Sequence, residues 1–235
     1  MIGFYDYTVI LTYLSLLSGS LGIIVCLSGM GHPFLGMLFL MACGLCDTFD
    51  GKVARTKKDR TPQQKAFGIQ IDSLADLVSF GVLPPCVGVA MLRISEKLSD
   101  VPKIKVADPT DKMVLHPIFL ISIGLFYVMA AMIRLAYFNV LEEERSKVEN
   151  TVRKYYVGLP VTSSALIFPS VMLIQYATDV DMSLLYFGVM LITAFLFILR
   201  IQVPKPKNKG IFILVAIGLA EFIALLAIRH YLKWR

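Results

Sequence analysis

The chain has 235 residues, of which 57% are hydrophobic and only 17% are charged. Its mean hydropathy of +0.71 is well above that of an ordinary soluble domain, which excludes a water-soluble globular enzyme. The net charge of +6 comes from basic residues in short segments beside apolar runs, and this favours contact with anionic lipid headgroups over contact with nucleic acid.

Long apolar stretches dominate the sequence. A membrane-crossing helix needs roughly 20 mostly apolar residues, and seven stretches come close to this length. They predict an all-α, polytopic integral membrane bundle that forms a single domain over residues 1–235. The predicted spans are about 8–29, 34–54, 69–93, 114–140, 159–177, 182–200 and 210–231. The segment 94–113 is expected to be the one substantial external loop, and no cleavable signal peptide is expected.

The basic residues also predict an orientation. Lys and Arg are more numerous on the side of the membrane that carries the 55–67 loop. Because cytoplasmic loops are enriched in Lys and Arg, we expect this loop to face the cytoplasm of a cell (inner or plasma) membrane. Seven spans then place the C-terminus outside.

Four aspartates occur within the second and third predicted spans. Asp47 and Asp50 are spaced i, i+3, and Asp72 and Asp76 are spaced i, i+4, so each pair projects from one helix face. A short connection favours antiparallel neighbours, so we expect the four carboxylates to meet near the cytoplasmic interface. Carboxylates brought together repel one another unless cations neutralise them, and oxygen ligands without His or Cys suit Mg²⁺, Mn²⁺ or Ca²⁺. Two such ions form the arrangement that clamps a phosphoryl group during displacement.

Small and basic residues accompany the aspartates. Gly51, Ala54 and Gly68 lie on the carboxylate faces and leave room for a ligand close to the backbone. Arg55 shares the face of Asp47 and is suited to bidentate binding of phosphate. Two metal ions and an arginine describe a site for a pyrophosphate group. The other basic residues around the loop are interpreted as solvated or in contact with lipid headgroups: Lys57, Lys58, Arg60 and Lys65.

These residues resemble a known family signature. The order Asp47-x-x-Asp50-Gly51-x-x-Ala54-Arg55, followed by Gly68-x-x-x-Asp72-x-x-x-Asp76, is similar to that of the CDP-alcohol phosphatidyltransferases. The resemblance covers about residues 8–175 and implies a six-helix core, here with about one extra C-terminal helix. Twelve residues separate Arg55 from Gly68, more than is usual in the family, and we expect the extra residues in a longer loop over 56–67.

The sequence around the second aspartate pair resembles one branch of the family. Asp72-Ser-Leu-Ala-Asp76-Leu-Val-Ser79-Phe-Gly81-Val-Leu-Pro84 looks like the branch that accepts serine, the CDP-diacylglycerol–serine O-phosphatidyltransferases. Two later segments agree with that branch, Arg134-Leu-Ala-Tyr-Phe-Asn139 and Tyr156-Val-Gly158-Leu-Pro160. The resemblance implies that CDP-diacylglycerol and L-serine react in the membrane to give phosphatidylserine and CMP. It also implies a homodimer.

The resemblance further implies roles for individual residues. Asp47, Asp50, Asp72 and Asp76 would bind two divalent ions, Mg²⁺ or Mn²⁺, and Asp76 would also act as the general base on the serine hydroxyl. The residues expected to contact the nucleotide and its diphosphate are Gly51, Ala54, Arg55 and Gly68.

Three polar residues are candidates for binding serine. Arg134 is a charge inside a predicted span, which calls for a ligand or a partner. It is a candidate for binding the serine carboxylate or the active-site phosphates, and the alternative is a structural pair with one aspartate. Ser79 follows Asp76 at i+3 and shares its helix face. Asn139 is expected either to line the pocket or to cap a helix.

Other functions remain open. The same chemistry could use glycerol phosphate, inositol phosphate or choline as acceptor, or an archaeal ether lipid as donor. A different class of protein, a cation transporter, could use the carboxylates as its ion site. A transporter predicts carboxylates near the bilayer midplane, often with broken helices in paired halves.

Overall fold

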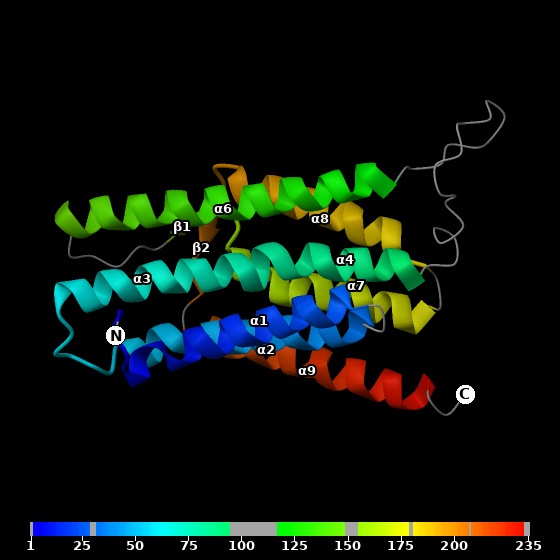
Figure 1. Cartoon of the computed structure of the whole chain (residues 1–235), viewed down its shortest axis with the longest axis horizontal. Coiled ribbons are helices and arrows are strands. Elements are labelled where there is room, and N and C mark those ends of the chain that lie inside the picture. Colours follow the sequence, from blue (N-terminus) through cyan, green and yellow to red (C-terminus); the bar gives the residue numbers. More distant parts are fainter. Residues whose placement is uncertain are drawn as a thin grey trace.

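The computed structural model describes residues 2–28, 32–94, 117–148, 155–178, 181–206 and 208–232. Within these ranges the chain forms a bundle of helices and one two-stranded sheet (Figure 1). The α-helices are α1 (Ile10–Leu27), α2 (Pro33–Ala54), α3 (Pro62–Asp76), α4 (Leu83–Ile94), α6 (Pro117–Val148), α7 (Ser164–Thr178), α8 (Ser183–Ile198) and α9 (Asn208–Leu232). The remaining elements are two 3-10 helices, η1 (Tyr7–Val9) and η3 (Val161–Ser163), the π-helix η2 (Leu77–Val82), and the strands β1 (Tyr155–Val157) and β2 (Gln202–Pro204).

The predicted fold class, a polytopic helical membrane bundle, is confirmed. In the part of the chain that the structure describes, six helical segments are long and apolar enough to cross a membrane. They are Tyr7–Leu27, Pro33–Ala54, Pro62–Arg93, Ile118–Glu144, Val161–Thr178 and Lys209–Ile228. The sixth predicted span, 182–200, contains the apolar helix α8, but its 16 residues are fewer than a membrane crossing requires. They rise only about 24 Å, less than a hydrocarbon core of about 30 Å. The external loop predicted at 94–113 lies outside the described residues except for its first residue.

The third helix begins earlier than the sequence predicted. α3 starts at Pro62 rather than near residue 69, directly after the N-cap residue Thr61. The Thr61 hydroxyl accepts a hydrogen bond from the Gln64 backbone N–H, and the Gln64 side chain accepts one from the Thr61 N–H, at 3.2 and 2.9 Å. The connection between α2 and α3 therefore comprises only residues 55–61. The prediction of a loop over 56–67 is wrong for residues 62–67, which form the first turns of α3.

A π-helix follows Asp76 directly and joins α3 to α4 in one continuous rod (Figure 1). Its widened turn precedes two prolines, Pro84 and Pro85, which have no backbone N–H to donate. In either an α or a π pattern, the carbonyl of Phe80 would need one of these two donors. The hydroxyl of Tyr127 from α6 donates to that carbonyl instead, at 2.9 Å, and its oxygen lies 2.7 Å from the hydroxyl of Ser164. This buried contact fixes the backbone immediately after Asp76.

Tyr127→Phe should therefore destabilise the fold. The change leaves the buried Phe80 carbonyl without its donor, which costs about 1–3 kcal/mol of unfolding free energy. The midpoint of thermal unfolding in detergent should fall relative to the wild type. Tyr137→Phe on the exposed face of the same helix is the matched control and should leave the midpoint unchanged. Equal midpoints for the two variants would contradict a structural role for this hydroxyl.

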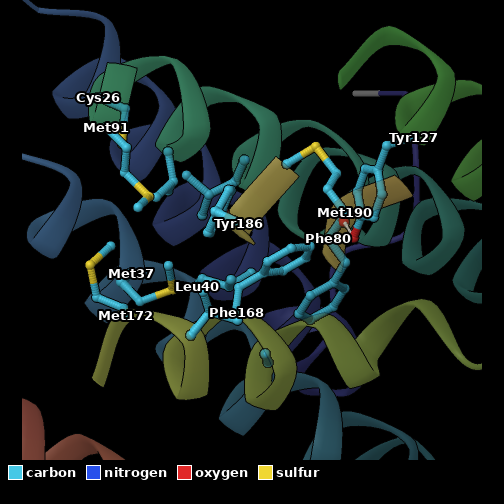
Figure 2. Close-up of a cluster of buried hydrophobic side chains, with 14 of the residues drawn as sticks. Cys26, Met37, Leu40, Phe80, Met91, Tyr127, Phe168, Met172, Tyr186 and Met190 are labelled. Carbon is cyan, nitrogen blue, oxygen red and sulfur yellow. Dashed lines mark hydrogen bonds between the residues drawn. The ribbon is translucent and has the colours of Figure 1, made fainter. Parts of the chain in front are cut away.

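The core of the bundle is aromatic and sulfur-rich (Figure 2). The ring of Phe168 from α7 lies between Tyr127 of α6 and Tyr186 of α8, with ring centroids 5.7 and 4.9 Å apart. Flexible side chains fill the space around these rings: Met37, Met91, Met172 and Met190. This packing holds α2, α4, α6, α7 and α8 in fixed relation to one another, so it also fixes where the aspartates of α2 can lie.

Two short strands pair the segment before α7 with the segment before α9. β1 and β2 are antiparallel, with Tyr156 opposite Val203. Gly158 follows with φ +75°, a left-handed backbone conformation that favours glycine, and its N–H donates to the Ile201 carbonyl at 2.8 Å. A Cβ at this position would lie 2.6 Å from the Phe197 carbonyl oxygen, so only glycine fits. The turn holds β1, and with it Tyr156, in place.

α9 lies on the outside of the bundle, on the opposite side from α6 in Figure 1. Only 6% of its apolar window is buried, and large side chains such as Phe212 and Ile213 are exposed. Such a surface suits contact with lipid. This helix corresponds to the last span that the sequence predicted, 210–231. Its Glu221 accepts a hydrogen bond from Ser170 of α7 at 2.5 Å, which joins the two helices.

Candidate active site

Two helices bring the aspartates together as the sequence predicted. Asp47 and Asp50 lie near the C-terminal end of α2, and Asp72 and Asp76 lie in the last two turns of α3. One carboxylate oxygen from each of Asp47, Asp50 and Asp72 lies within 4.8 Å of the others. Asp76 is only 8% exposed and interacts electrostatically with all three. The i, i+3 and i, i+4 spacings produce this cluster because each places two carboxylates on one helix face.

The cluster has the chemistry of a divalent cation site. Among the described residues no Lys, Arg or His forms an ion pair with any of the four carboxylates. Elsewhere in the described part of the chain, an ion pair joins Lys57 to Asp6 at 3.0 Å. There, hydrogen bonds from the hydroxyl of Thr8 and from Lys57 lower the pKa of Asp6 to about 2. The carboxylates of the cluster converge without such a partner, and they offer only oxygen ligands, which hard cations prefer.

Arg134 of α6 lies near this cluster. Its side chain is 8% exposed and acts electrostatically on Asp76 and Asp47. Its Nε is buried and has no hydrogen-bond partner, and the guanidinium carbon lies 5.1 Å from the ring centre of Phe138. A desolvated cation with an unused donor beside the carboxylates is suited to bind an anionic part of a substrate.

Tyr156 of β1 lies near both Arg134 and Asp47. Burial raises the pKa of its phenol above the ordinary value, so the side chain stays neutral and can donate a hydrogen bond at neutral pH. Tyr156 and Asp47 both line a cavity of about 760 Å³ between α2, α7, α9 and the two strands. Most of the lining is apolar and includes Leu45, Leu166 and Phe222. The cavity thus places an apolar space directly beside a carboxylate.

The small residues of the signature lie beside arginines. A Cβ added at Gly51 would lie 3.3 Å from Nη1 of Arg55, and one added at Gly68 would lie 2.5 Å from Nη2 of Arg60. Arg55 therefore lies over Gly51, the residue that follows Asp50. Ala54 is the last residue of α2 and is partly buried. Arg60, which was interpreted as a solvated loop residue, lies over α3 instead.

Two of the serine-binding candidates make contacts that the sequence did not predict. Ser79 is fully buried, and its hydroxyl donates to the carbonyl of Ser15 in α1 at 3.2 Å. A Cβ at Gly19 would lie 2.7 Å from the Ser79 hydroxyl, so this glycine allows the close approach of α1. Asn139 of α6 donates from Nδ2 to the hydroxyl of Ser73 in α3 at 2.8 Å. These contacts join Ser79 to α1 and Asn139 to α3.

The contacts of Ser73 and of Arg60 were not predicted from the sequence. Ser73 lies one residue away from the carboxylate face, and its partner Asn139 lies far along the chain. No spacing rule relates residues on two helices that are not consecutive. The position of Arg60 depends on the early start of α3, which the capping residues Thr61 and Gln64 signal in retrospect.

A comparison with protein-family models finds a match to the CDP-alcohol phosphatidyltransferase model over residues 8–217. The matched region covers most of the chain and contains all four aspartates. The chain belongs to the CDP-alcohol phosphatidyltransferase family. This family typically uses divalent metal ions, in agreement with the carboxylate cluster of Asp47, Asp50 and Asp72.

Similar curated proteins carry the name CDP-diacylglycerol–serine O-phosphatidyltransferase. The one from Saccharomyces cerevisiae is 33% identical over 164 residues, which are 67% of this chain and 50% of the yeast protein. The one from Helicobacter pylori is 28% identical over 240 residues, and the match covers 86% of each chain. The one from Methanocaldococcus jannaschii is 25% identical over 220 residues, 94% of this chain and 83% of that protein.

Proposed function

We propose that this protein transfers the phosphatidyl group of CDP-diacylglycerol to the hydroxyl of L-serine, giving phosphatidylserine and CMP. The observation that carries the proposal is the convergence of Asp47, Asp50 and Asp72 within 4.8 Å, with the buried Asp76 and Arg134 beside them. The names of the similar proteins support serine as the acceptor.

The aspartates have two proposed tasks. Asp47, Asp50, Asp72 and Asp76 hold two divalent ions, Mg²⁺ or Mn²⁺. When bound, these ions neutralise the charge of the diphosphate and make its phosphorus more electrophilic. Asp76 also accepts the proton of the serine hydroxyl as the oxygen forms its bond to phosphorus and the bond to the CMP oxygen breaks. Burial of Asp76 keeps water away from the position where serine must enter.

The other residues bind the two substrates. Gly51, Ala54 and Gly68 leave space beside the two helices for the nucleotide and for the arginine side chains around it, and Arg55 contacts the diphosphate. Arg134 binds the serine carboxylate, because its guanidinium is buried beside the proposed base and has an unused donor. Asn139 and Ser79 are assigned to the wall of the serine pocket, where their hydrogen bonds to Ser73 and Ser15 hold the helices in place.

The apolar cavity beside Asp47 supports a lipid donor. Its volume of about 760 Å³ and its lining from α2, α7 and α9 suit an acyl or ether chain, whereas a soluble phosphate ester has no part that fills it. A cation transporter has no use for such a space. In addition, Asp47 and Asp50 lie near the end of α2 rather than at its middle. These features favour an integral membrane enzyme whose site faces the cytoplasm.

The assay for this function uses purified protein reconstituted in vesicles with CDP-diacylglycerol, labelled serine and Mn²⁺ or Mg²⁺. Labelled phospholipid and equimolar CMP are the expected products, and a chelator should abolish both. Parallel reactions contain glycerol phosphate, inositol phosphate or choline in place of serine, and an ether-linked donor in place of the diacyl donor. Acceptance of another alcohol without serine would contradict the assignment of serine. Cross-linking of the reconstituted protein tests the proposed homodimer.

A further inference from the structure

The side chain of Arg60 lies along the first turns of α3. Its Nη2 donates to the carbonyl of Gln64 at 3.1 Å, and a Cβ at Gly68 would lie 2.5 Å from the same nitrogen. The guanidinium therefore occupies the space that Gly68 leaves open. The capping box of Thr61 and Gln64 fixes the start of the helix and so fixes the backbone from which this side chain departs.

This position lies over Gly68, one helical turn before a carboxylate of the site. Gly68 precedes Asp72 by four residues, so the two share one helix face and lie one turn apart. On the facing helix Arg55 lies over Gly51, which follows Asp50. The 55–61 connection thus places one arginine beside a signature glycine of each helix, on the side of the aspartates that leads to this connection.

Most of the hydrogen-bonding capacity of Arg60 is unused. A guanidinium carries five N–H donors, and the contact with Gln64 uses one of them. Its Nε is buried and has no partner. A buried donor without a partner is unfavourable unless a ligand supplies the acceptor, and an arginine with free donors matches phosphate oxygens and ribose hydroxyls.

We propose that Arg60 is a second nucleotide-binding arginine, which contacts the phosphate of the leaving cytidylate. The inference rests on the proposed function. The lipid part of the donor must lie among the apolar helices, so the nucleotide part must extend toward the polar 55–61 connection, where Arg60 lies. This residue belongs to the stretch in which the chain is longer than is usual in its family. The additional residues of the 56–67 segment thus supply both the proposed contact with the cytidylate and the first turns of α3.

The test compares Arg60→Ala with Lys58→Ala, an exposed cation of the same connection. Both variants and the wild type are reconstituted in phosphatidylcholine nanodiscs with Mn²⁺, and CMP binding is measured by calorimetry. Arg60→Ala should weaken CMP binding and raise the KM for CDP-diacylglycerol, each by roughly tenfold, the loss typical of one charge-assisted contact. The KM for serine should stay unchanged, and Lys58→Ala should change no value by more than about twofold.

Other outcomes overturn the inference in distinguishable ways. Equal losses in both variants, or a loss that appears only in vesicles with anionic lipid, would show that Arg60 binds lipid headgroups instead. An increase confined to the KM for serine would place Arg60 in the acceptor site. Unchanged CMP binding in Arg60→Ala would refute the role of Arg60 but would leave the proposed function intact. CMP binding by the wild type without transfer to serine would refute the proposed acceptor and leave the role of Arg60 intact.

A double-mutant cycle tests the contact with Gly68. Gly68→Ala places a methyl group where Nη2 of Arg60 lies, so the guanidinium must move and CMP binding should weaken by about the same factor. Adding Gly68→Ala to Arg60→Ala should cause little further loss. Fully additive losses would show that the glycine acts independently of the arginine. If Gly68→Ala does not fold, the comparison of Arg60→Ala with Lys58→Ala decides the matter.

Discussion

Asp76→Asn should reduce turnover by roughly 10²–10⁴-fold, the range expected when a general base is lost. Asparagine has nearly the same shape but cannot accept the proton of the serine hydroxyl. Asp47, Asp50 and Asp72 remain within 4.8 Å of one another, so the variant should keep part of its metal binding and its binding of CMP. Single-turnover formation of labelled phospholipid measures the chemical step, and calorimetry with Mn²⁺ measures the retained binding.

Two controls separate loss of the base from other causes. Asp59→Asn changes an exposed carboxylate in the 55–61 connection and should leave turnover unchanged. Asp50→Asn removes a cluster carboxylate and should weaken Mn²⁺ binding more than Asp76→Asn does. Near-normal turnover in Asp76→Asn would show that another group accepts the proton. Complete loss of Mn²⁺ binding in that variant would show that Asp76 acts chiefly as a metal ligand.

The sequence predicted the features that depend on local spacing. Apolar stretches of sufficient length predicted the helices, because a membrane span requires about 20 apolar residues. The separations of Asp47 from Asp50 and of Asp72 from Asp76 predicted which carboxylates share a face, because helix geometry fixes this relation. A short connection between consecutive helices was enough to bring the two pairs together.

Features that depend on contacts between distant segments could not be predicted in this way. Ser79 shares a face with Asp76 in an α-helix, but a π-helix begins at Leu77, and the hydroxyl meets Ser15 of α1. The widened turn is stable because Tyr127, almost 50 residues later, satisfies the Phe80 carbonyl. The early start of α3 was missed because its first turns are polar and hydropathy does not detect them. The capping residues around Pro62 mark that start more reliably than hydropathy does.

Arg134→Ala should lower kcat/KM for serine by about 10²-fold, mainly through a higher KM for serine. Removing a buried charge that binds an opposite charge on a ligand costs several kcal/mol, and each 1.4 kcal/mol corresponds to a tenfold change. Arg134→Lys keeps the charge but loses the planar pair of donors, so it should recover only part of the affinity. The KM for CDP-diacylglycerol should change much less in both variants. Initial rates at varied serine and fixed CDP-diacylglycerol give the KM for serine. Initial rates at varied CDP-diacylglycerol and fixed serine give the KM for the donor.

The alternative role of Arg134, a structural partner of Asp76 and Asp47, predicts a different pattern. Loss of a structural cation would lower the midpoint of thermal unfolding and disturb both KM values together, because the carboxylates would repel one another more strongly. Arg93→Ala provides the matched control, since this arginine donates to the carbonyls of Leu27 and Ser28 at the end of α1. That variant should lower the unfolding midpoint without a selective change in the KM for serine. A selective effect in Arg134→Ala, together with partial recovery in Arg134→Lys, is the result that only direct binding of the serine carboxylate explains.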